Sequence, residues 1–484
     1  MSHDSLPLYI QAKDLLLQKD SLISLAYASL TIALLVLIVD YARMLNLRRK
    51  MPPGPFPLPI VGNTFFLPDT KPWFYFEKLS RKYNAPMITF WIGRNPTVWL
   101  NDAWAASELL DKRAGIYSSR PRMVVFGELG SGDWNLVTMK YGERWYHLTK
   151  RQCTDDRRVH RKITHLGVGT QQVRSYRTIQ NNESKLIALS LLDEPTRFEK
   201  HFERYAASVV SIIAYGRRIP SYLDPIITEV IAVMQFAAEL NVPGKTFPML
   251  METFPILAKF PNWMAPWKRG LGGRRRGKDF FFSLAKEAND ESPNDNFARQ
   301  IFDLKEKYDL DDREISAISG NLFGAGSDTS SSTLVTMVLA CVMFPDAVKR
   351  AQKEIDEVVG LDGSPDFDDL LNMPYVEAFV KEVFRWRSVA IIGGQPHAPI
   401  QDDHYNGWFI PKNTWVQGNL WYSLRQSQLT SGPYIVILAI SLIQIDSTPI
   451  DISKKTSCRT QTKRDITPLV GDDEVPSFPL YAEL

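Results

Sequence analysis

The chain has 484 residues, of which 44% are hydrophobic and 23% are charged, and its formal net charge is +3. This composition is ordinary for a globular protein with a sizeable core. The small net charge gives no reason to expect nucleic acid as a partner. Three cysteines are too few for a disulfide framework, so we expect the bulk of the chain to lie in a reducing compartment.

The N-terminal region contains an uninterrupted apolar stretch at residues 22–39, after a segment formed by residues 1–21. It is just long enough to span the hydrocarbon of a bilayer as a helix, although a buried core helix is the alternative. A basic cluster follows directly and marks a cytosolic flank; it consists of Arg43, Arg48, Arg49 and Lys50. The pattern predicts a single transmembrane anchor at 22–39 with the rest of the chain in the cytosol.

Residues 40–59 combine this basic cluster with a Pro-rich segment that has five prolines between Met51 and Pro59. Each proline fixes φ and removes a backbone donor, so neither a helix nor a central strand can continue there. Such a segment is typical of a stiff connection. We therefore expect a hinge at 40–59 between the anchor and a globular body at 60–421.

The body has the pattern of a mainly helical protein with a small β portion. Residues 87–100 are rich in β-forming residues around a turn at 93–96, and residues 404–411 form a second strand pair around Asn406-Gly407. Apolar periodicity predicts helices at 204–215, 226–240 and 312–343.

The predicted helix at 312–343 carries the residues with the clearest chemical potential. Gly324 and Gly326 lie inside it, where each costs about 1 kcal/mol relative to Ala. Close approach of a flat ligand to the backbone would explain them, and a packing notch of small residues is the alternative. Asp328 and Thr329 add an acid and a hydroxyl nearby. Further on, Glu382 and Arg385 are spaced i, i+3 and share one helix face.

Taken together, residues 323–330 and the tetrapeptide Glu382-Val-Phe-Arg385 resemble two signatures of the haem-thiolate monooxygenases, the cytochrome P450 family. Residues 254–263 and 410–421 resemble its fungal microsomal members in particular. The resemblance implies the cytochrome P450 fold and haem as the cofactor. It further implies residue roles: haem contact by Ala325 and Gly326, proton delivery to dioxygen by Asp328 and Thr329, a buried structural ion pair of Glu382 with Arg385, and a propionate contact by His397.

The family also has a Trp followed four residues later by a basic residue, both of which reach the haem propionates. In this chain Trp145 is followed at that spacing by Thr149. Removing residues 146–157 would join Trp145 to the segment that ends at Arg161, and would restore the spacing with Arg161 as the basic partner. Residues 146–157 are either translated non-coding sequence or a genuine surface insertion.

A second departure concerns the iron ligand, which the family takes from a loop of the form Phe-x-x-Gly-x-Arg-x-Cys-x-Gly. The thiolate is essential because it pushes electron density toward O–O cleavage. Cys458 is only a weak candidate, because the four other positions of the pattern do not match; they hold Asp451, Lys454, Thr456 and Thr460. Cys341 lies on the helix at 312–343, and Cys153 lies in the suspected insertion. No metal ligand is therefore assigned.

Residues 422–484 form an atypical tail with little periodicity, so we expect the C-terminal part of the fold to be incomplete. A misread intron or frameshift near Trp421 would explain the change, and a divergent tail that still binds haem is the alternative.

The resemblance implies a monooxygenase that oxidises a small lipophilic compound in secondary-metabolite biosynthesis. It would be anchored once in the endoplasmic reticulum membrane, with electrons supplied by an NADPH-dependent flavin reductase. The alternative function is a catalytically inactive membrane protein of this kind, or the product of a misread gene, that lacks the iron-ligating cysteine.

Overall fold

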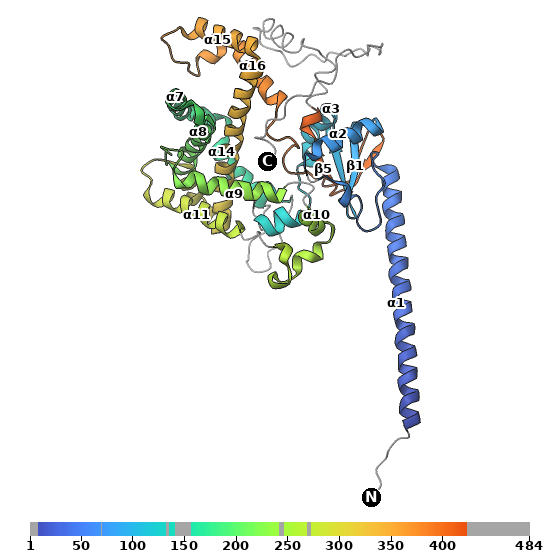
Figure 1. Cartoon of the computed structure of the whole chain (residues 1–484). Coiled ribbons are helices and arrows are strands. Elements are labelled where there is room, and N and C mark those ends of the chain that lie inside the picture. Colours follow the sequence, from blue (N-terminus) through green and yellow to red (C-terminus); the bar gives the residue numbers. More distant parts are fainter. Residues whose placement is uncertain are drawn as a thin grey trace, which may run out of the picture. The chain divides into compact units, whose positions relative to one another are not determined.

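The structure, a computed structural model, describes residues 8–68, 70–131, 135–140, 156–241, 246–268 and 273–423 (Figure 1). Its first element is the long helix α1 (Leu8–Lys50). The part Ile23–Lys50 is long and apolar enough to cross a membrane. Its apolar 18-residue stretch has a mean hydropathy of 2.2, and none of that stretch is buried in the protein. The predicted anchor at 22–39 therefore lies within a longer helix, because no proline interrupts the chain between Leu8 and Pro52.

The C-terminal end of α1 is fastened to the Pro-rich segment that follows it. The Tyr41 hydroxyl donates to the carbonyl oxygen of Pro57 at 3.0 Å, and Arg48 Nη2 donates to that of Gly54 at 2.9 Å. Met44 is buried in the same cluster as Trp91 of the first strand. The segment thus returns along the end of the helix and packs against the body.

The β portion consists of two small sheets (Figure 1). Strands β1 (Met87–Ile92) and β2 (Asn95–Leu100) pair antiparallel, and β5 (Trp415–Gly418) joins β2 in parallel. Strands β3 (Asp403–Tyr405) and β4 (Trp408–Ile410) form the second sheet. Both strand pairs predicted from the sequence are confirmed.

The remaining elements are helices, which confirms the predicted mainly helical class. Those that precede the helical core are α2 (Pro72–Tyr83), α3 (Ala103–Ala106), α4 (Ala114–Tyr117) and the short helical segments η1 (Thr64–Phe66), η2 (Ser107–Lys112) and η3 (Val124–Ser131). The core region contains α5 (Asp156–Val168), α6 (Thr170–Ser175), α7 (Arg177–Asp193), η4 (Pro195–Arg197), α8 (Phe198–Tyr215), α9 (Pro225–Asn241), α10 (Thr246–Thr253), η5 (Pro255–Lys259), η6 (Asn262–Met264), η7 (Pro266–Lys268), α11 (Gly273–Glu291), α12 (Phe297–Asp303), α13 (Lys305–Tyr308) and α14 (Asp312–Met343).

Helix α14 is central to this region, with α8 and α11 packed along it (Figure 1). Phe323 of α14 is fully buried, and its ring meets Tyr215 and Phe281 edge-on with centroids 5.6 Å and 6.3 Å away. Such edge-to-face pairs add about 0.5–1.5 kcal/mol each beyond the burial of area. The helix that carries the predicted chemistry is therefore packed against α8 and α11 through Phe323.

A buried ion pair joins α7 to α8. Arg204 Nη1 lies 2.6 Å from Glu183 Oε2, and both side chains are almost fully buried. The other carboxylate oxygen accepts from Arg218 Nε at 2.7 Å. Glu183 therefore has a cationic donor on each oxygen, which is the arrangement that makes a buried carboxylate tolerable.

A second ion pair joins the end of η2 to the second sheet. Arg113 Nη1 lies 2.9 Å from Asp403 Oδ2, which also accepts from the Tyr117 hydroxyl at 2.9 Å. Burial alone would raise the pKa of Asp403, but hydrogen bonds from the His404 backbone, Tyr117 and Arg113 outweigh it, so the pKa is lowered.

The chain divides into two compact units. The first runs to Met343 and resumes at Val383. The described part of the second, residues 344–382, contains α15 (Pro345–Val359), η8 (Asp369–Asn372) and most of α16 (Pro374–Trp386). Within it, both oxygens of Glu354 accept from the first amides of α16, Tyr375 N at 3.0 Å and Val376 N at 2.7 Å, and so cap that helix.

Candidate active site

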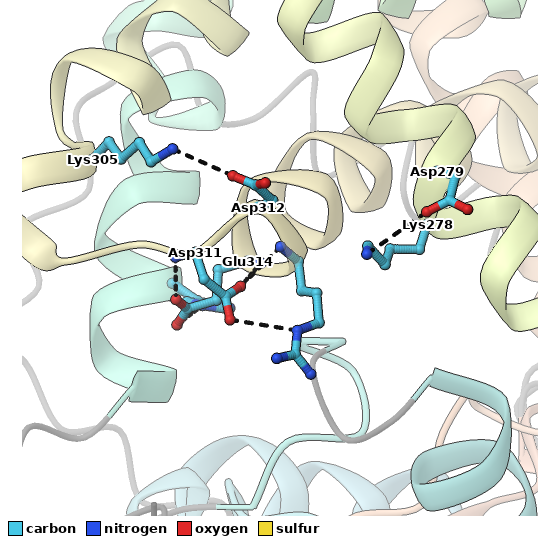
Figure 2. A network of polar contacts seen from close by, with 8 residues as sticks. Lys278, Asp279, Lys305, Asp311, Asp312 and Glu314 are labelled. Atoms are coloured by element: carbon cyan, nitrogen blue, oxygen red, sulfur yellow. Dashed lines mark hydrogen bonds and ion pairs between the residues drawn. The ribbon is translucent and has the colours of Figure 1, made fainter. Parts of the chain in front are cut away.

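Helix α14 begins with a reciprocal capping box (Figure 2). The Asp311 carboxylate accepts from Glu314 N at 2.9 Å, and Glu314 Oε2 accepts from Asp311 N at 2.9 Å. Each side chain satisfies a backbone donor that the first helical turn leaves unpaired. Lys305 Nζ also pairs with Asp312 at 3.3 Å. This capping sets the start of α14, and with it the position of the residues further along the helix.

The capping box also has a partner on another helix. Glu314 Oε1 lies 3.3 Å from Nε2 of His160 on α5, and the two side chains are 2% and 0% exposed. Because a carboxylate accepts, the imidazole donates from Nε2. The contact joins α5 to the first turn of α14 without any help from solvent.

Further along α14, the acid and the hydroxyl predicted to act in catalysis are both solvent-exposed. Thr329 Oγ1 donates to the carbonyl oxygen of Ala325 at 2.6 Å, and Ala325 is exposed as well. Although Asp328 reaches solvent, partial burial raises the pKa of its carboxyl, and the charge of Glu203 on α8 raises it further. The structure thus places an acid with weakened acidity and a hydroxyl at adjacent, exposed positions of α14.

Gly324 and Gly326, two of the three glycines of α14, face neighbouring helices. A Cβ added to Gly326 would lie 2.3 Å from Val210 Cγ1 of α8, and one added to Gly324 would lie 2.8 Å from Met234 Sδ of α9. Close helix packing is therefore sufficient to explain both glycines. Of the two interpretations left open by the sequence, the small-residue notch has direct structural support, and haem contact by Gly326 stays a prediction.

The three residues predicted to contact the haem propionates, Trp145, Arg161 and His397, lie on different parts of the chain. Trp145 and most of the suspected insertion lie outside the described residues, and Arg161 is exposed on α5. The backbone of His397 pairs with Val416 of β5, and its Nδ1 donates to the carbonyl oxygen of Tyr117 at 2.9 Å. A neutral His397 with this tautomer has no proton on Nε2, so a propionate contact there requires the imidazolium form.

Glu382 and Arg385 both lie on α16, three residues apart. Each has an intermediate exposure instead of the full burial that the family role implies. Their structural ion pair stays a prediction.

The described residues fit one side of a haem site and not the other. The exposed Ala325–Thr329 face can form a wall with an acid and a hydroxyl, but the only cysteine in the described part of the chain is Cys341. Burial raises the pKa of its thiol, which disfavours the thiolate that a metal requires. It also lies on α14 itself, about 18 Å beyond Thr329 along the axis. Cys153 and Cys458 lie outside the described residues, so the described part of the chain provides no thiolate ligand for the iron.

The fold defines a class: mainly helical proteins built around one long central helix. Comparison with known proteins makes the class specific, because the cytochrome P450 family model matches residues 52–431. The chain is 32% identical to cytochrome P450 monooxygenase 58 of Postia placenta over 81% of its length and 72% of the relative's. It is 35% identical to a cytochrome P450 monooxygenase of Armillaria gallica, over 81% and 74%. A third relative, cytochrome P450 monooxygenase polD of Polytolypa hystricis, is 33% identical over 84% and 76%.

The chain therefore belongs to the cytochrome P450 family, whose members are haem-dependent oxidoreductases. The family match ends at residue 431, so Cys458 lies beyond it.

Sequence reasoning missed several buried polar side chains elsewhere in the fold, among them His160, Arg204 and Glu252. The Asp-x-x-Glu spacing of residues 311–314 is a recognisable capping signal and could have located the start of α14. No comparable local signal exists for His160, because its partner lies 154 residues away.

Proposed function

We propose that this fold serves the haem-dependent monooxygenation of a small lipophilic compound in secondary-metabolite biosynthesis, and that the chain as printed lacks the iron ligand this reaction needs. The observation that carries the first statement is the exposed pair of Asp328 and Thr329 on the central helix. The cysteine positions carry the second.

When bound, haem would supply the activation of dioxygen, and the chain would handle protons. The raised pKa of Asp328 makes its carboxyl easier to protonate from solvent near neutral pH than an ordinary aspartate. Thr329 already donates to the Ala325 carbonyl, which leaves its oxygen lone pairs as acceptors toward the exposed face. Adjacent residues of a helix leave it about 100° apart, so a proton relay from Asp328 to Thr329 would pass through a bridging water.

Membrane attachment supports a lipophilic substrate. Helix α1 has the length and composition of a single span, and the cluster Arg43–Lys50 at its end favours a cytosolic body. Trp263 and Met264 of η6 are 83% and 44% exposed, so they are surface residues and not core residues. Such exposed apolar side chains suit contact with a bilayer surface. We place the protein in the endoplasmic reticulum membrane, where an NADPH-dependent flavin reductase would supply electrons.

The second candidate function is that of a catalytically inactive membrane protein of the same family. The observation that favours it is the mismatch at all four positions around Cys458, together with the protonated character of Cys341. It differs from the first candidate in whether any form of this gene product carries the cysteine loop.

A chimera tests whether this fold can bind haem once the cysteine loop is supplied. Residues 424–484 are replaced by the segment of a fungal relative that carries the Phe-x-x-Gly-x-Arg-x-Cys-x-Gly loop, and the matched control has that cysteine changed to serine. We expect the carbon monoxide difference spectrum of thiolate-ligated haem from the chimera, and from neither the control nor the printed chain. A folded chimera that binds no haem would refute the monooxygenase function.

Sequencing of full-length messenger RNA addresses the origin of the mismatch. We expect the native transcript to differ from the printed sequence near residues 146–157 and after Trp421. A transcript that reproduces the printed protein in both places would refute the misreading and support the inactive relative.

A further inference from the structure

A small cavity lies at the end of α8, apart from the candidate active site. Its volume is about 210 Å³, and its walls come from the junction of α6 with α7, the last turn of α8, and the segment 294–300 that leads into α12. None of the described residues that line it belongs to α14. The cavity is therefore separate from the acid and the hydroxyl at positions 328 and 329, and we call it the α8 cavity.

The inner surface of the α8 cavity is apolar and aromatic. Ile212 and Ile213 of α8 line it with intermediate exposure, and Phe297 of α12 is 2% exposed. One glycine fixes both aromatic rings of the lining. The Tyr176 hydroxyl donates to the carbonyl oxygen of Gly167 at 2.9 Å, and a Cβ on Gly167 would lie 2.8 Å from Phe297 Cδ2. The interior thus offers a fixed surface to an apolar ring or short chain.

The rim of the α8 cavity carries a single formal charge. Asp295 is the only Asp, Glu, Lys or Arg among the described residues that line it, and its side chain is exposed. Burial is the main cause that raises the pKa of Tyr176; a hydrogen bond from Gln172 lowers it, and the charge of Asp295 raises it further. The Asp295 carboxylate therefore acts electrostatically at the aromatic wall of the cavity.

The segment that carries Asp295 is held in place by hydrogen bonds. Asn296 is 3% exposed, and its Nδ2 donates to the carbonyl oxygens of Ala288 at 3.3 Å and Asn294 at 3.1 Å. Its Oδ1 accepts from Arg299 N at 2.9 Å. The Arg299 guanidinium donates to backbone carbonyl oxygens of the same segment, so it is engaged there and does not neutralise Asp295. Within the described part of the chain, the cavity is preformed and its carboxylate has no ion-pair partner.

We propose that the α8 cavity binds a small organic cation, with a primary ammonium group against Asp295 and one ring or short apolar chain against Ile212 and Ile213. A carboxylate beside an aromatic ring suits an ammonium group, because the face of the ring also attracts a cation. The volume limits the size of the ligand. A dry cavity of about 150 Å³ holds benzene, and sites for drug-sized ligands begin at about 300 Å³. This binding site goes beyond the proposed function and needs no haem.

Nuclear magnetic resonance of isoleucine methyl groups tests the site in the full chain, in non-ionic detergent. Benzylamine is the probe, and benzyl alcohol is its neutral counterpart of the same size. Each is titrated to about 10 mM, well above the roughly 1 mM dissociation constant expected for so small a ligand. We expect saturable shifts of the Ile212 and Ile213 methyls and none of Ile88, which is buried in a separate cluster around β1. Benzylamine should bind about fivefold more tightly than benzyl alcohol, and added salt should reduce this difference.

Three variants decide which groups bind the probe. Asp295→Asn removes the charge at an exposed position, so we expect it to weaken benzylamine about fivefold and to leave benzyl alcohol unchanged. Asp193→Asn is the matched control, because this exposed aspartate ends α7 about 21 Å along the axis from Ile179 of the lining, and it should keep the preference for the amine. Gln300→Phe places a ring in the cavity and should weaken both ligands alike.

The proposal is overturned if benzylamine gives no saturable shift at Ile212 and Ile213, or if the wild-type protein binds the amine and the alcohol equally well. An Asp295→Asn variant that keeps the wild-type preference would also overturn it. The unchanged Ile88 methyl reports in each sample that the variant is folded, and the wild-type comparison of the two probes stands without any variant.

Discussion

The packing of Gly326 against Val210 gives the sharpest test of how the central helix is built. In Gly326→Ala the new Cβ would lie 2.3 Å from Val210 Cγ1, and valine is stiff at χ1, so the side chain cannot simply turn away. Overpacking of this kind costs about 1–3 kcal/mol. The change also gains about 1 kcal/mol of helix propensity. The expected net effect is a loss of about 0–2 kcal/mol of unfolding free energy.

A second substitution, at Val210, measures the steric cost of the new Cβ separately from the gain in helix propensity. In a Val210→Ala background the offending methyl is absent, so Gly326→Ala should instead stabilise the protein by about 1 kcal/mol. The double-mutant cycle should therefore give a coupling energy of about 1–3 kcal/mol between the two positions. Gly324→Ala is the matched control: its new Cβ would meet the thioether of Met234 at 2.8 Å, and a flexible methionine can move aside.

The assay is urea unfolding of the full chain in detergent, followed by tryptophan fluorescence, with the slope compared between variants to confirm that only stability changed. We expect Gly326→Ala to be less stable than Gly324→Ala, and Val210→Ala to reverse the sign of the Gly326→Ala effect. If Gly326→Ala costs the same in both backgrounds, helix packing does not explain this glycine.

Three further predictions concern polar groups that stabilise the fold. Arg204→Met leaves the buried Glu183 without its shorter ion pair and should cost about 3–5 kcal/mol in urea unfolding, whereas a cost below about 1 kcal/mol would show that the pair is not buried in solution. Asp311→Ala removes one half of the capping box and should cost about 1 kcal/mol in the same assay; no loss would contradict the capping. Because the pKa of Asp403 is lowered in the folded protein, its carboxylate stabilises the fold above about pH 4, and this stabilisation is lost as pH falls below that. Asp403→Asn should therefore lower the free energy of unfolding at pH 7 and have a smaller effect at pH 3. An equal effect at both pH values would contradict the ion pair.

The sequence was most informative where structure depends on neighbours along the chain. The β1–β2 hairpin follows from its β-forming residues around one turn, and the apolar pattern of 312–343 predicted the limits of α14. The predicted anchor at 22–39 is shorter than α1, because hydropathy marks the apolar core of a helix and not its polar ends.

Contacts between remote segments could not be predicted in this way. Glu252 meets Val125 across 127 residues, and nothing local to a glutamate in the sequence Met-Glu-Thr identifies which backbone amides it will cap. The function of Gly326 was ambiguous for the same reason, because its explanation lies on α8 and not on its own helix. The family signatures placed Asp328 and Thr329 at adjacent positions of one helix, and their exposure is a finding of the structure; their catalytic role stays a prediction.

The most direct test of the central claim is the carbon monoxide difference spectrum of the reduced full-length chain, expressed as printed with haem precursor in excess. A fold of the cytochrome P450 family without its cysteine loop should give a folded, membrane-bound protein with no spectrum of thiolate-ligated haem. A normal thiolate spectrum from this same polypeptide would show that one of its three cysteines binds the iron, and would contradict the account.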